Sequence, residues 1–430
     1  MSCKMISNTI NKEAFVWIWL PGKTKPIVAG RLEANNGNFL FNYGRSYLER
    51  LNDKQPSIAI YNTELPLKSG VLPLLNGLSI PGCIRDAAPD AWGRRIIINK
   101  ILHIGGSQVD TAQLDELTYL LESGSDRIGA LDFQLSATEY VPRLSNNVHL
   151  DELLESSQKI EEGIPLSIEL DQALLHGSSI GGARPKALIE ASDKKIIAKF
   201  PSSSDHFNVL KAEFIAMRLA KIVGLNVASV ELTSALKKDV LLIERFDRIA
   251  SKNGWQRKCM VSALTLLGLD EMMARYASYE TLAEIIRHRF NSPKKALKEL
   301  FSRLVFNILS GNNDDHARNH AAFWDGQQLS LTPAYDICPQ ARSGNIASQA
   351  MLISGNDNRS QLKLCLDIAH QFQLSKTEAK TIIEKQTDLI MHNWDIVCEE
   401  AQLSEVEKKF LWHRQFLNPF VFEGLTQIPI

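Results

Sequence analysis

Paired cysteines are missing from this chain of 430 residues. Its six cysteines stand alone, at positions 3, 83, 259, 338, 365 and 398, so the sequence contains no CxxC pair and no zinc-binding spacing. Scattered single cysteines fit a reducing compartment, where buried thiols behave as small apolar side chains. The cysteine pattern therefore favours a cytoplasmic protein without a zinc module.

Long apolar runs and an excess of charge are missing as well. No apolar run approaches the roughly 20 residues that span a bilayer, and the first residues, MSCKMISNTINKEAF, lack the apolar core of a signal peptide. The formal net charge is -1, which gives no general attraction to nucleic acid or to an anionic membrane. We therefore expect no membrane partner, and any contact with DNA would need a local basic patch or a partner protein.

What is present is the composition of an ordinary globular protein, 44% hydrophobic and 23% charged, without a fixed-period repeat. A chain of this length is expected to form two or three domains. Strands are predicted at residues 15–20, 30–34 and 39–41, with Asn36-Gly37 as a hairpin turn. A helix is predicted after Pro89, with Trp92, Ile96, Ile97 and Ile101 on one face, and residues 139–150 are predicted to be a linker.

The middle of the chain changes character. Residues 174–200 predict a glycine-rich loop between short strands, with a turn near Asp193. Residues 209–223 predict a helix that Gly224 would end, and two strands follow, the second ending in DVLLIERFDR. From about Asn253 onward the chain is predicted to be mainly helical, with one interruption at residues 311–339. A β-rich part followed by a helix-rich part suggests two lobes with a cleft between them.

The interruption between helices carries the most chemical information. A helix ends at Gly311 and is followed by NNDDHARN, in which Asp314 and Asn319 are five positions apart, and a predicted hairpin then leads to Asp336. Phosphoryl transfer needs one carboxylate for the acceptor hydroxyl, and an amide and a second carboxylate for magnesium. The interval from Asp314 to Asn319 equals that of the protein-kinase catalytic loop HRDxxxxN. A solvated polar loop is the plainer alternative.

Other parts of a nucleotide site stand upstream in the order found in kinases. Gly177, Gly181 and Gly182 would let a backbone approach phosphates, although such a cluster can also be a simple turn. Lys199 lies on a strand, on the same face as Ile197, where it needs an anionic partner or an outlet to water. Glu213, on the next helix, would pair with it as in kinases. LLIERFDR is a candidate hinge beside an adenine, or a strand that ends in a surface salt bridge.

Together these segments give the chain a specific resemblance. SSIGGARPKAL, IIAKFP, EFIAMRLAKIVGLNVA, LLIERFDR, GNNDDHARNHAAF and LTPAYDICP occur in the order and approximate spacing of the HipA family of type II toxin–antitoxin serine/threonine kinases, and AAPDAWGRR is similar too. The resemblance extends from about residue 15 to beyond residue 340. It implies an α+β, protein-kinase-like fold of two lobes, with a β-rich N-terminal subdomain (1–150), a region with the glycine-rich loop (151–250) and a mainly helical C-terminal lobe with the catalytic loop (251–430).

The resemblance also implies a role for each matching residue. Asp314 would be the catalytic aspartate, Asn319 and Asp336 would bind Mg²⁺, and Lys199 would position the ATP phosphates. The remaining residues expected at ATP are Gly181, Gly182, Ala183, Arg184, Pro185 and Lys186 in the loop, Glu244, Arg245 and Phe246 at the adenine, and His316 and Tyr335 close by. Relatives phosphorylate a serine of their own glycine-rich loop, which maps best onto Ser179, although Ser178 stays open.

Partners follow from the same resemblance. It implies a HipB-like helix-turn-helix antitoxin, operator DNA reached through that antitoxin, and a protein serine as acceptor, an aminoacyl-tRNA synthetase being the best-studied target of the family. This sequence departs from some relatives at Arg184-Pro185 in the loop and in having two adjacent aspartates, Asp314-Asp315. The first difference bears on the flexibility of the loop, and the second on which aspartate is catalytic.

Two other functions stay open at this point. His316 and His320 are four residues apart, just after the two aspartates, so HARNH could hold the metal of a metal-dependent phosphohydrolase. A catalytically silent scaffold that only binds an antitoxin or DNA is the third interpretation. The complete set of Lys199, Asp314, Asn319 and Asp336 argues against that scaffold.

Overall fold

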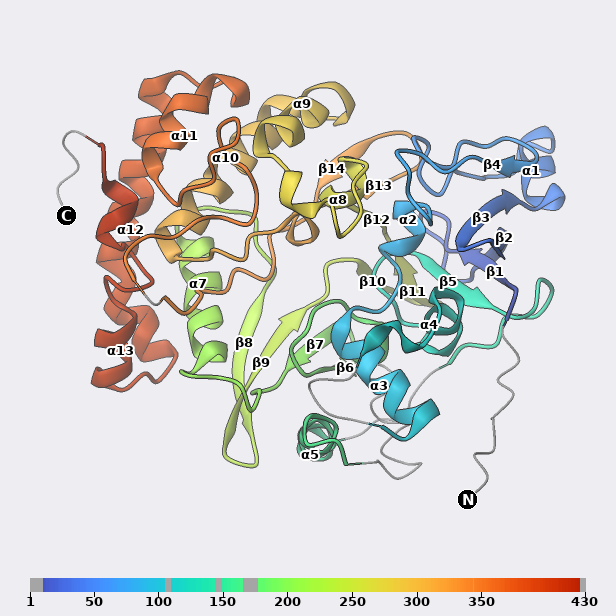
Figure 1. Cartoon of the computed structure of the whole chain (residues 1–430), viewed down its shortest axis with the longest axis horizontal. Helices are drawn as coiled ribbons and strands as arrows, with labels where there is room; N and C mark the ends of the chain where they lie inside the picture. The colour runs from blue at the N-terminus through green and yellow to red at the C-terminus, as the bar shows by residue number, and fades with distance from the viewer. Residues whose placement is uncertain (1–10, 105–109, 144–148, 165–176, 343, 426–430) are drawn as a thin grey trace.

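The fold is that of a computed structural model, which describes residues 11–104, 110–143, 149–164, 177–342 and 344–425 (Figure 1). The N-terminal part is built on a five-stranded antiparallel sheet in the order β4-β3-β2-β1-β5. Its strands are β1 (Glu13–Ile18), β2 (Ile27–Asn35), β3 (Asn38–Tyr43), β4 (Val71–Leu72) and β5 (Leu131–Gln134). The predicted hairpin is confirmed, because Asn36 and Gly37 have φ of 49° and 82° in the tight turn between β2 and β3.

Short helices surround this sheet: α1 (Arg45–Asn52), α2 (Gly82–Arg85), α3 (Ala91–Leu102) and α4 (Glu116–Glu122). The helix predicted after Pro89 is confirmed as α3, but the prediction of one shared face is wrong. Trp92 and Ile96 pack in one apolar cluster, whereas Ile97 and Ile101 pack in another beside Tyr119. Adjacent helical residues point about 100° apart, so a helix enclosed on two sides is apolar on both.

A second sheet follows, with four antiparallel strands in the order β6-β7-β9-β8. They are β6 (Lys186–Glu190), β7 (Lys195–Lys199), β8 (Val230–Ala235) and β9 (Lys238–Glu244), accompanied by α5 (Leu150–Glu161) and α7 (Val209–Ile222). The predicted helix is confirmed as α7, and Gly224 follows its end at φ 95°. The turn near Asp193 is confirmed between β6 and β7. Asn146 and Asn147 of the predicted linker, and the strand expected before the glycine-rich loop, lie outside the described residues.

The last part is mostly helical, but not from Asn253 as predicted. Residues 248–262 form β10 (Arg248–Ser251), β11 (Gly254–Arg257) and β12 (Cys259–Ser262), and β12 pairs with β13 (Ala321–Trp324), which pairs with β14 (Leu329–Leu331). Local sequence did not reveal β12 because the residues of its partner strand lie 59 to 65 positions further along the chain. The predicted loop and hairpin after Gly311 are confirmed, and Gly311 ends its helix at φ 70°.

The helices of this part contribute to the largest hydrophobic core, which also extends into the N-terminal sheet and α7. They are α8 (Ala263–Leu266), α9 (Tyr279–Arg289), α10 (Pro293–Ser310), α11 (Leu362–Ile368), α12 (Lys376–Glu400) and α13 (Glu405–Leu411). Short 3-10 turns occupy Thr111–Gln113, Gly177–Ser179, Ala274–Tyr276, Ala317–Asn319, Ala369–Phe372 and Pro419–Phe422. Helix α10 lies at the centre, with Leu300, Phe301 and Leu304 fully buried.

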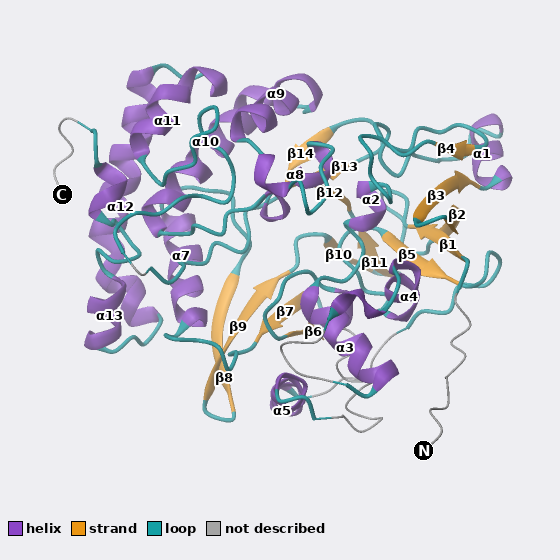
Figure 2. Cartoon of the chain, viewed as in Figure 1, coloured by secondary structure: helices purple, strands orange, loops and turns teal. Residues whose placement is uncertain are grey.

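Figure 2 shows the resulting division: helices α7 and α10–α13 gather at one end, and the N-terminal sheet lies at the other, with the smaller sheets between. This division places the glycine-rich loop, β7 and the segment after α10 next to one another. In the part of the chain that the structure describes, no helix has both the length and the apolar character needed to cross a membrane.

Candidate active site

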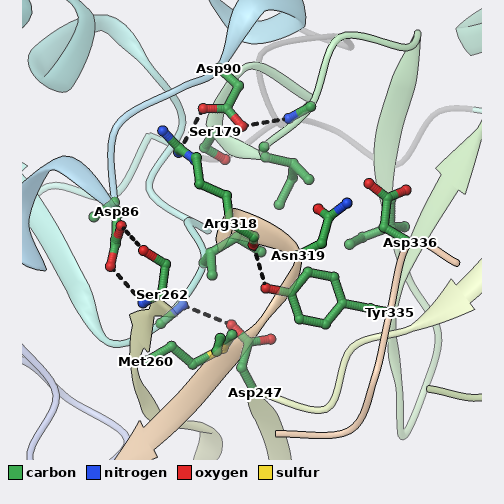
Figure 3. A pocket seen from close by; sticks show the side chains of 18 of the residues that line it. Asp86, Asp90, Ser179, Asp247, Met260, Ser262, Arg318, Asn319, Tyr335 and Asp336 are labelled. Carbon is green, nitrogen blue, oxygen red and sulfur yellow. Dashed lines mark hydrogen bonds and ion pairs between the residues drawn. The ribbon is translucent and has the colours of Figure 1, made fainter. Parts of the chain in front are cut away.

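A cavity of about 430 Å³ lies where the three parts meet. That volume falls within the range of small-molecule sites. Most residues expected at ATP line it: Gly181, Gly182, Ala183, Lys186, Lys199, Glu244, Arg245, Phe246, His316, Asn319, Tyr335 and Asp336. Ser179 lines it too, whereas Arg184, Pro185 and Asp314 are not among the lining residues. Figure 3 shows Asn319, Tyr335 and Asp336 on one side of this space, and Asp90 and Arg318 beside them.

Lys199 lies between two carboxylates. Its Nζ is 2.6 Å from Oε1 of Glu213 on α7 and also bonds to Oδ1 of Asp336. Burial alone lowers the pKa of Lys199, but the two carboxylates more than offset this, so its pKa is raised. The side chain is therefore held as an ammonium ion inside the cavity. The pairing of Lys199 with Glu213, expected from kinase order, is present.

Lys186 supplies a second positive charge. It lies opposite Lys199 in the register of β6 and β7, and its Nζ donates to the carbonyl of Gly181. Burial, and then repulsion by Lys199, lowers the pKa of Lys186 to about 8. Two adjacent ammonium groups repel each other unless an anion lies between them, so this pair is arranged for a polyanionic ligand.

Asp336 turns toward the cavity from a constrained backbone. Its φ of 58° is unusual for a residue with a Cβ, and this conformation places the carboxylate beside Lys199. Tyr335 next to it is fixed by its hydroxyl, which donates to the carbonyl of Arg318 at 2.7 Å. Burial alone raises the pKa of Asp336, but Lys199 and Lys186 lower it well below its ordinary value. The group is thus a carboxylate whose second oxygen is available to a cation.

The adjacent aspartates of the loop after α10 have different surroundings. Asp315 is buried, and its Oδ1 is 2.8 Å from Nε2 of His320 while Tyr279 donates to its Oδ2. Asp314 is more exposed and does not itself line the cavity, although His316 two residues later does, and partial desolvation of the Asp314 carboxyl group raises its pKa. Its main-chain carbonyl accepts a hydrogen bond from Nδ2 of Asn319 at 3.1 Å. Of the two aspartates only Asp314 is therefore exposed, and its role as the catalytic aspartate stays a prediction.

The same segment bears on the alternative function, a metal-dependent phosphohydrolase with His316 and His320 as ligands. The segment is an extended loop followed by a 3-10 turn rather than a helix, so His316 and His320 do not share a helical face. His316 lines the cavity, whereas His320 is buried with Asp315 and Tyr279. Within the described residues no three His, Cys, Asp or Glu side chains gather where they could hold a metal ion. The geometry gives the phosphohydrolase interpretation no support.

The glycine-rich loop rests on the N-terminal part of the protein. Ser178 accepts a hydrogen bond from the amide of Gly124 at 3.1 Å, and the Ser179 hydroxyl donates to the carbonyl of Asp126 at 3.4 Å. Both serines are buried, but only Ser179 lines the cavity. Arg184 forms two bonds with Asp205, of 2.6 and 2.7 Å, instead of turning toward the cavity.

Residues 244–246 leave β9 along the wall of the cavity that Tyr335 also lines. The ring of Phe246 lies 5.7 Å from that of Tyr335, which gives this wall an aromatic surface suited to a flat base. The side chain of Arg245 instead points into a buried ion cluster, with Asp126 at 3.1 Å and Asp247 at 2.9 Å. We therefore assign Arg245 to the wall by its position in the chain, not by its charge.

Sequence reasoning missed the acidic residues that the N-terminal part brings to the cavity. Asp86 accepts from the amide and the hydroxyl of Ser262, both at 2.7 Å, and Asp90 contacts both Gly182 and Arg318. The motif AAPDAWGRR contains Asp90 and was the available signal. It gave no role to Asp90 because the partners lie 92 and 228 positions away, and only packing brings them together.

Comparison with known proteins shows which family has a similar sequence and fold. Family models of the HipA N-terminal domain and of the HipA-like C-terminal domain match residues 19–134 and 178–394, the second covering half of the chain. A curated relative, the serine/threonine-protein kinase toxin HipA of Shewanella oneidensis, is 27% identical over 183 residues. That match covers 37% of this chain and 42% of the relative, so it spans less than half of the relative's length.

A solved structure has a similar fold over nearly the whole chain. It is a HipA toxin–antitoxin system of Shewanella oneidensis MR-1, with HipA, HipB and operator DNA. The TM-score is 0.67 at 19% identity, covering 94% of this chain and 95% of the other. This likeness confirms the predicted α+β, protein-kinase-like fold with a β-rich N-terminal part and a mainly helical C-terminal part. With the two family matches, it follows that the chain belongs to the HipA family.

Proposed function

We propose that this protein is an ATP- and Mg²⁺-dependent protein serine/threonine kinase, the toxin of a toxin–antitoxin module. One observation carries the proposal: Lys199 is held between Glu213 and Asp336 inside a cavity that Asn319 also lines, and Asp314 stands five residues before Asn319. Kinases use a lysine paired with a helix glutamate for the phosphates, and an aspartate after the catalytic loop for magnesium. The name of the curated relative, a serine/threonine-protein kinase toxin, supports the same activity.

The donor atoms fit magnesium. Asp336 offers a carboxylate oxygen, and Asn319 offers its amide oxygen, since the amide nitrogen is bonded to the carbonyl of Asp314. Hard oxygen donors from one or two side chains, completed by phosphate and water, are what Mg²⁺ prefers. When bound, the ion neutralises charge on the phosphates. The protein residues orient the γ-phosphoryl group and exclude water from it.

The reaction assigns a separate part to each remaining residue. Asp314 accepts the proton of the acceptor hydroxyl while the hydroxyl oxygen forms a bond to the γ-phosphorus. The bond between that phosphorus and the bridging β–γ oxygen breaks, and ADP leaves. The raised pKa of Asp314 makes it a stronger base than an ordinary aspartate. Lys199 and Lys186 stabilise the charge on the phosphates, and Phe246 and Tyr335 would flank the adenine.

The finer parts of the proposal concern acceptors and partners. We propose transfer to a protein serine, of which an aminoacyl-tRNA synthetase is one candidate, and self-phosphorylation at Ser179. A HipB-like helix-turn-helix antitoxin, and operator DNA through it, are the proposed partners, supported by the composition of the similar complex. The net charge of -1 agrees with DNA contact through a partner. A cytoplasmic location is proposed from the unpaired cysteines.

The activity is tested by incubating the purified protein with γ-labelled ATP and either Mg²⁺ or EDTA. We expect label on the protein with Mg²⁺ and none with EDTA, and no label with Lys199→Ala. Lys238→Ala is the matched control, because Lys238 is exposed at the start of β9 in the same sheet and does not line the cavity. Equal labelling of both variants would contradict the assignment of Lys199.

A further inference from the structure

Helix α3 of the N-terminal part holds the glycine-rich loop by several hydrogen bonds, and we call this contact surface of α3 the seat of the loop. The carbonyl of Gly182 accepts from the amide of Trp92 at 3.2 Å, and Nε1 of Trp92 donates to the carbonyl of Lys186 at 2.9 Å. Arg95 donates to the carbonyl of Ala183 at 2.7 Å. These bonds run from one turn of α3 to the loop and the start of β6. The loop that would cover the phosphates is thus held from outside the kinase-like part.

Asp90 makes the central contact of this seat. Its Oδ2 accepts from the amide of Gly182 at 2.7 Å, and its Oδ1 lies 2.7 Å from Nη2 of Arg318 in the segment after α10. One carboxylate therefore joins three segments that are far apart in sequence. Figure 3 shows Asp90 and Arg318 facing each other over the cavity. A Cβ at Gly181 would come within 2.8 Å of the same carboxylate, so the loop fits closely around it.

The position of Asp90 in the helix makes this use of its carboxylate distinctive. An aspartate at an N-cap ordinarily accepts from an amide of its own first turn. Asp90 is the N-cap of α3, yet its side chain makes no such bond, whereas Asp115, the N-cap of α4, accepts from the amide of Thr118. The carboxylate of Asp90 instead binds the amide of Gly182 and the guanidinium of Arg318. Its function therefore lies in the loop rather than in helix stability.

We propose that Asp90 is a positioning residue that clamps the glycine-rich loop onto the segment carrying Asp314 and Asn319, and so sets the fraction of molecules able to bind nucleotide. Ser179 is 2% exposed in this clamped state, so the loop must leave its seat before Ser179 can be modified. The N-terminal part thereby gains control over the loop that covers the proposed nucleotide site. This inference rests on the proposed kinase function for its nucleotide, but the clamp itself can be tested without one.

The test uses the full-length protein and the variants Asp90→Ala and Asp90→Asn. Amide hydrogen exchange of residues 178–186, measured without nucleotide, is expected to accelerate about 10-fold or more in Asp90→Ala, since a hydrogen bond to a charged group is lost. Affinity for ATP with Mg²⁺ is expected to fall about 10-fold or more, because fewer molecules are competent to bind. Asp90→Asn keeps an acceptor for Gly182 and loses the charge facing Arg318, so we expect intermediate values.

Asp115→Ala is the matched control. It removes an N-cap in the same part of the protein and lies away from the cavity, so it is expected to lower the free energy of unfolding by loss of its cap while leaving loop exchange and ATP affinity unchanged. Unchanged loop exchange in Asp90→Ala would overturn the clamp. Absence of ATP binding by the wild-type protein would instead contradict the proposed function, leaving the exchange result to decide on the clamp separately.

Discussion

Two clusters of charged side chains lie at the same cavity, and they differ in whether a ligand can reach their charges. In the junction cluster, Asp126 and Asp247 each contact both Arg245 and Arg248, at 2.8 to 3.1 Å, and all four side chains are buried. Lys195 also contacts Asp126, at 3.3 Å, so each charge of this cluster has a buried partner of opposite sign. This cluster joins the N-terminal part to the strand beyond β9.

The cavity cluster, formed by Lys199, Glu213 and Asp336, is instead open to a ligand. Lys199 pairs with both carboxylates, Lys186 lies beside it, and 39% of the Asp336 side chain remains exposed. A buried ion pair that satisfies itself contributes to structure, whereas an exposed charge that faces a cavity can bind a ligand or an ion. Burial and strong pairing alone therefore do not mark the proposed catalytic groups, but exposure of a paired charge to the cavity does.

The largest effect is expected where the cavity cluster is broken. Asp336→Asn removes a negative charge from the proposed magnesium site and should abolish measurable phosphoryl transfer. The free energy of unfolding should change by only about 1 kcal/mol, because Asp336 is partly exposed and Lys199 keeps Glu213. Label transfer from ATP and urea unfolding measure the two quantities. Phosphoryl transfer at the wild-type rate by Asp336→Asn would contradict the assignment of Asp336 to the magnesium site.

The adjacent aspartates sharpen the same comparison within one loop. Asp314→Ala should lower the rate about 10²–10⁴-fold, the usual contribution of a positioned proton acceptor, with little change in stability. Asp315→Ala leaves His320 and Tyr279 without their buried partner, so it should cost about 3–5 kcal/mol of unfolding free energy and less of the rate per folded molecule. Rates normalised to folded protein separate the two. The reverse result would shift the catalytic position by one residue.

The junction cluster should respond in the opposite way to the cavity cluster. Asp126→Asn leaves Arg245 and Arg248 buried with one negative charge fewer, at a cost of about 3–5 kcal/mol in unfolding free energy. The rate of phosphoryl transfer per folded molecule should change much less than in Asp314→Ala. Urea unfolding and single-turnover transfer at low temperature provide the comparison. A catalytic loss as large as that of Asp314→Ala would erase the distinction between the clusters.

The sequence predicted those parts of the site that depend on local order. Lys199 and Glu213 stand fourteen residues apart on a strand and the following helix, and Asp314 and Asn319 share one loop, so short-range pattern is enough to find them. The hairpin at Asn36-Gly37 was predictable for the same reason, whereas the fold class followed from the family resemblance. The prediction of one apolar face failed at Ile96 and Ile97, which pack in different clusters. The periodicity of a helix does not tell how many neighbouring elements enclose it.

Residues whose roles depend on distant packing could not be predicted. Asp90 reaches Gly182 and Arg318 only because α3 lies against the loop. Arg184 was expected at the nucleotide from its place in the loop, but a bidentate partner, Asp205, holds it elsewhere. Sequence order gives the set of residues near a site, and only tertiary contacts decide which of their side chains face it.

The central claim is that the open cluster catalyses phosphoryl transfer from ATP, and self-phosphorylation tests it most directly. Wild-type protein and Asp314→Ala are produced in the same host and incubated with ATP and Mg²⁺, and phosphate is located by intact mass and peptide mapping. We predict phosphate at Ser179 in the wild-type protein and none in Asp314→Ala. Phosphate at Ser179 in both proteins would mean that another kinase adds it, and its absence from both would contradict the account.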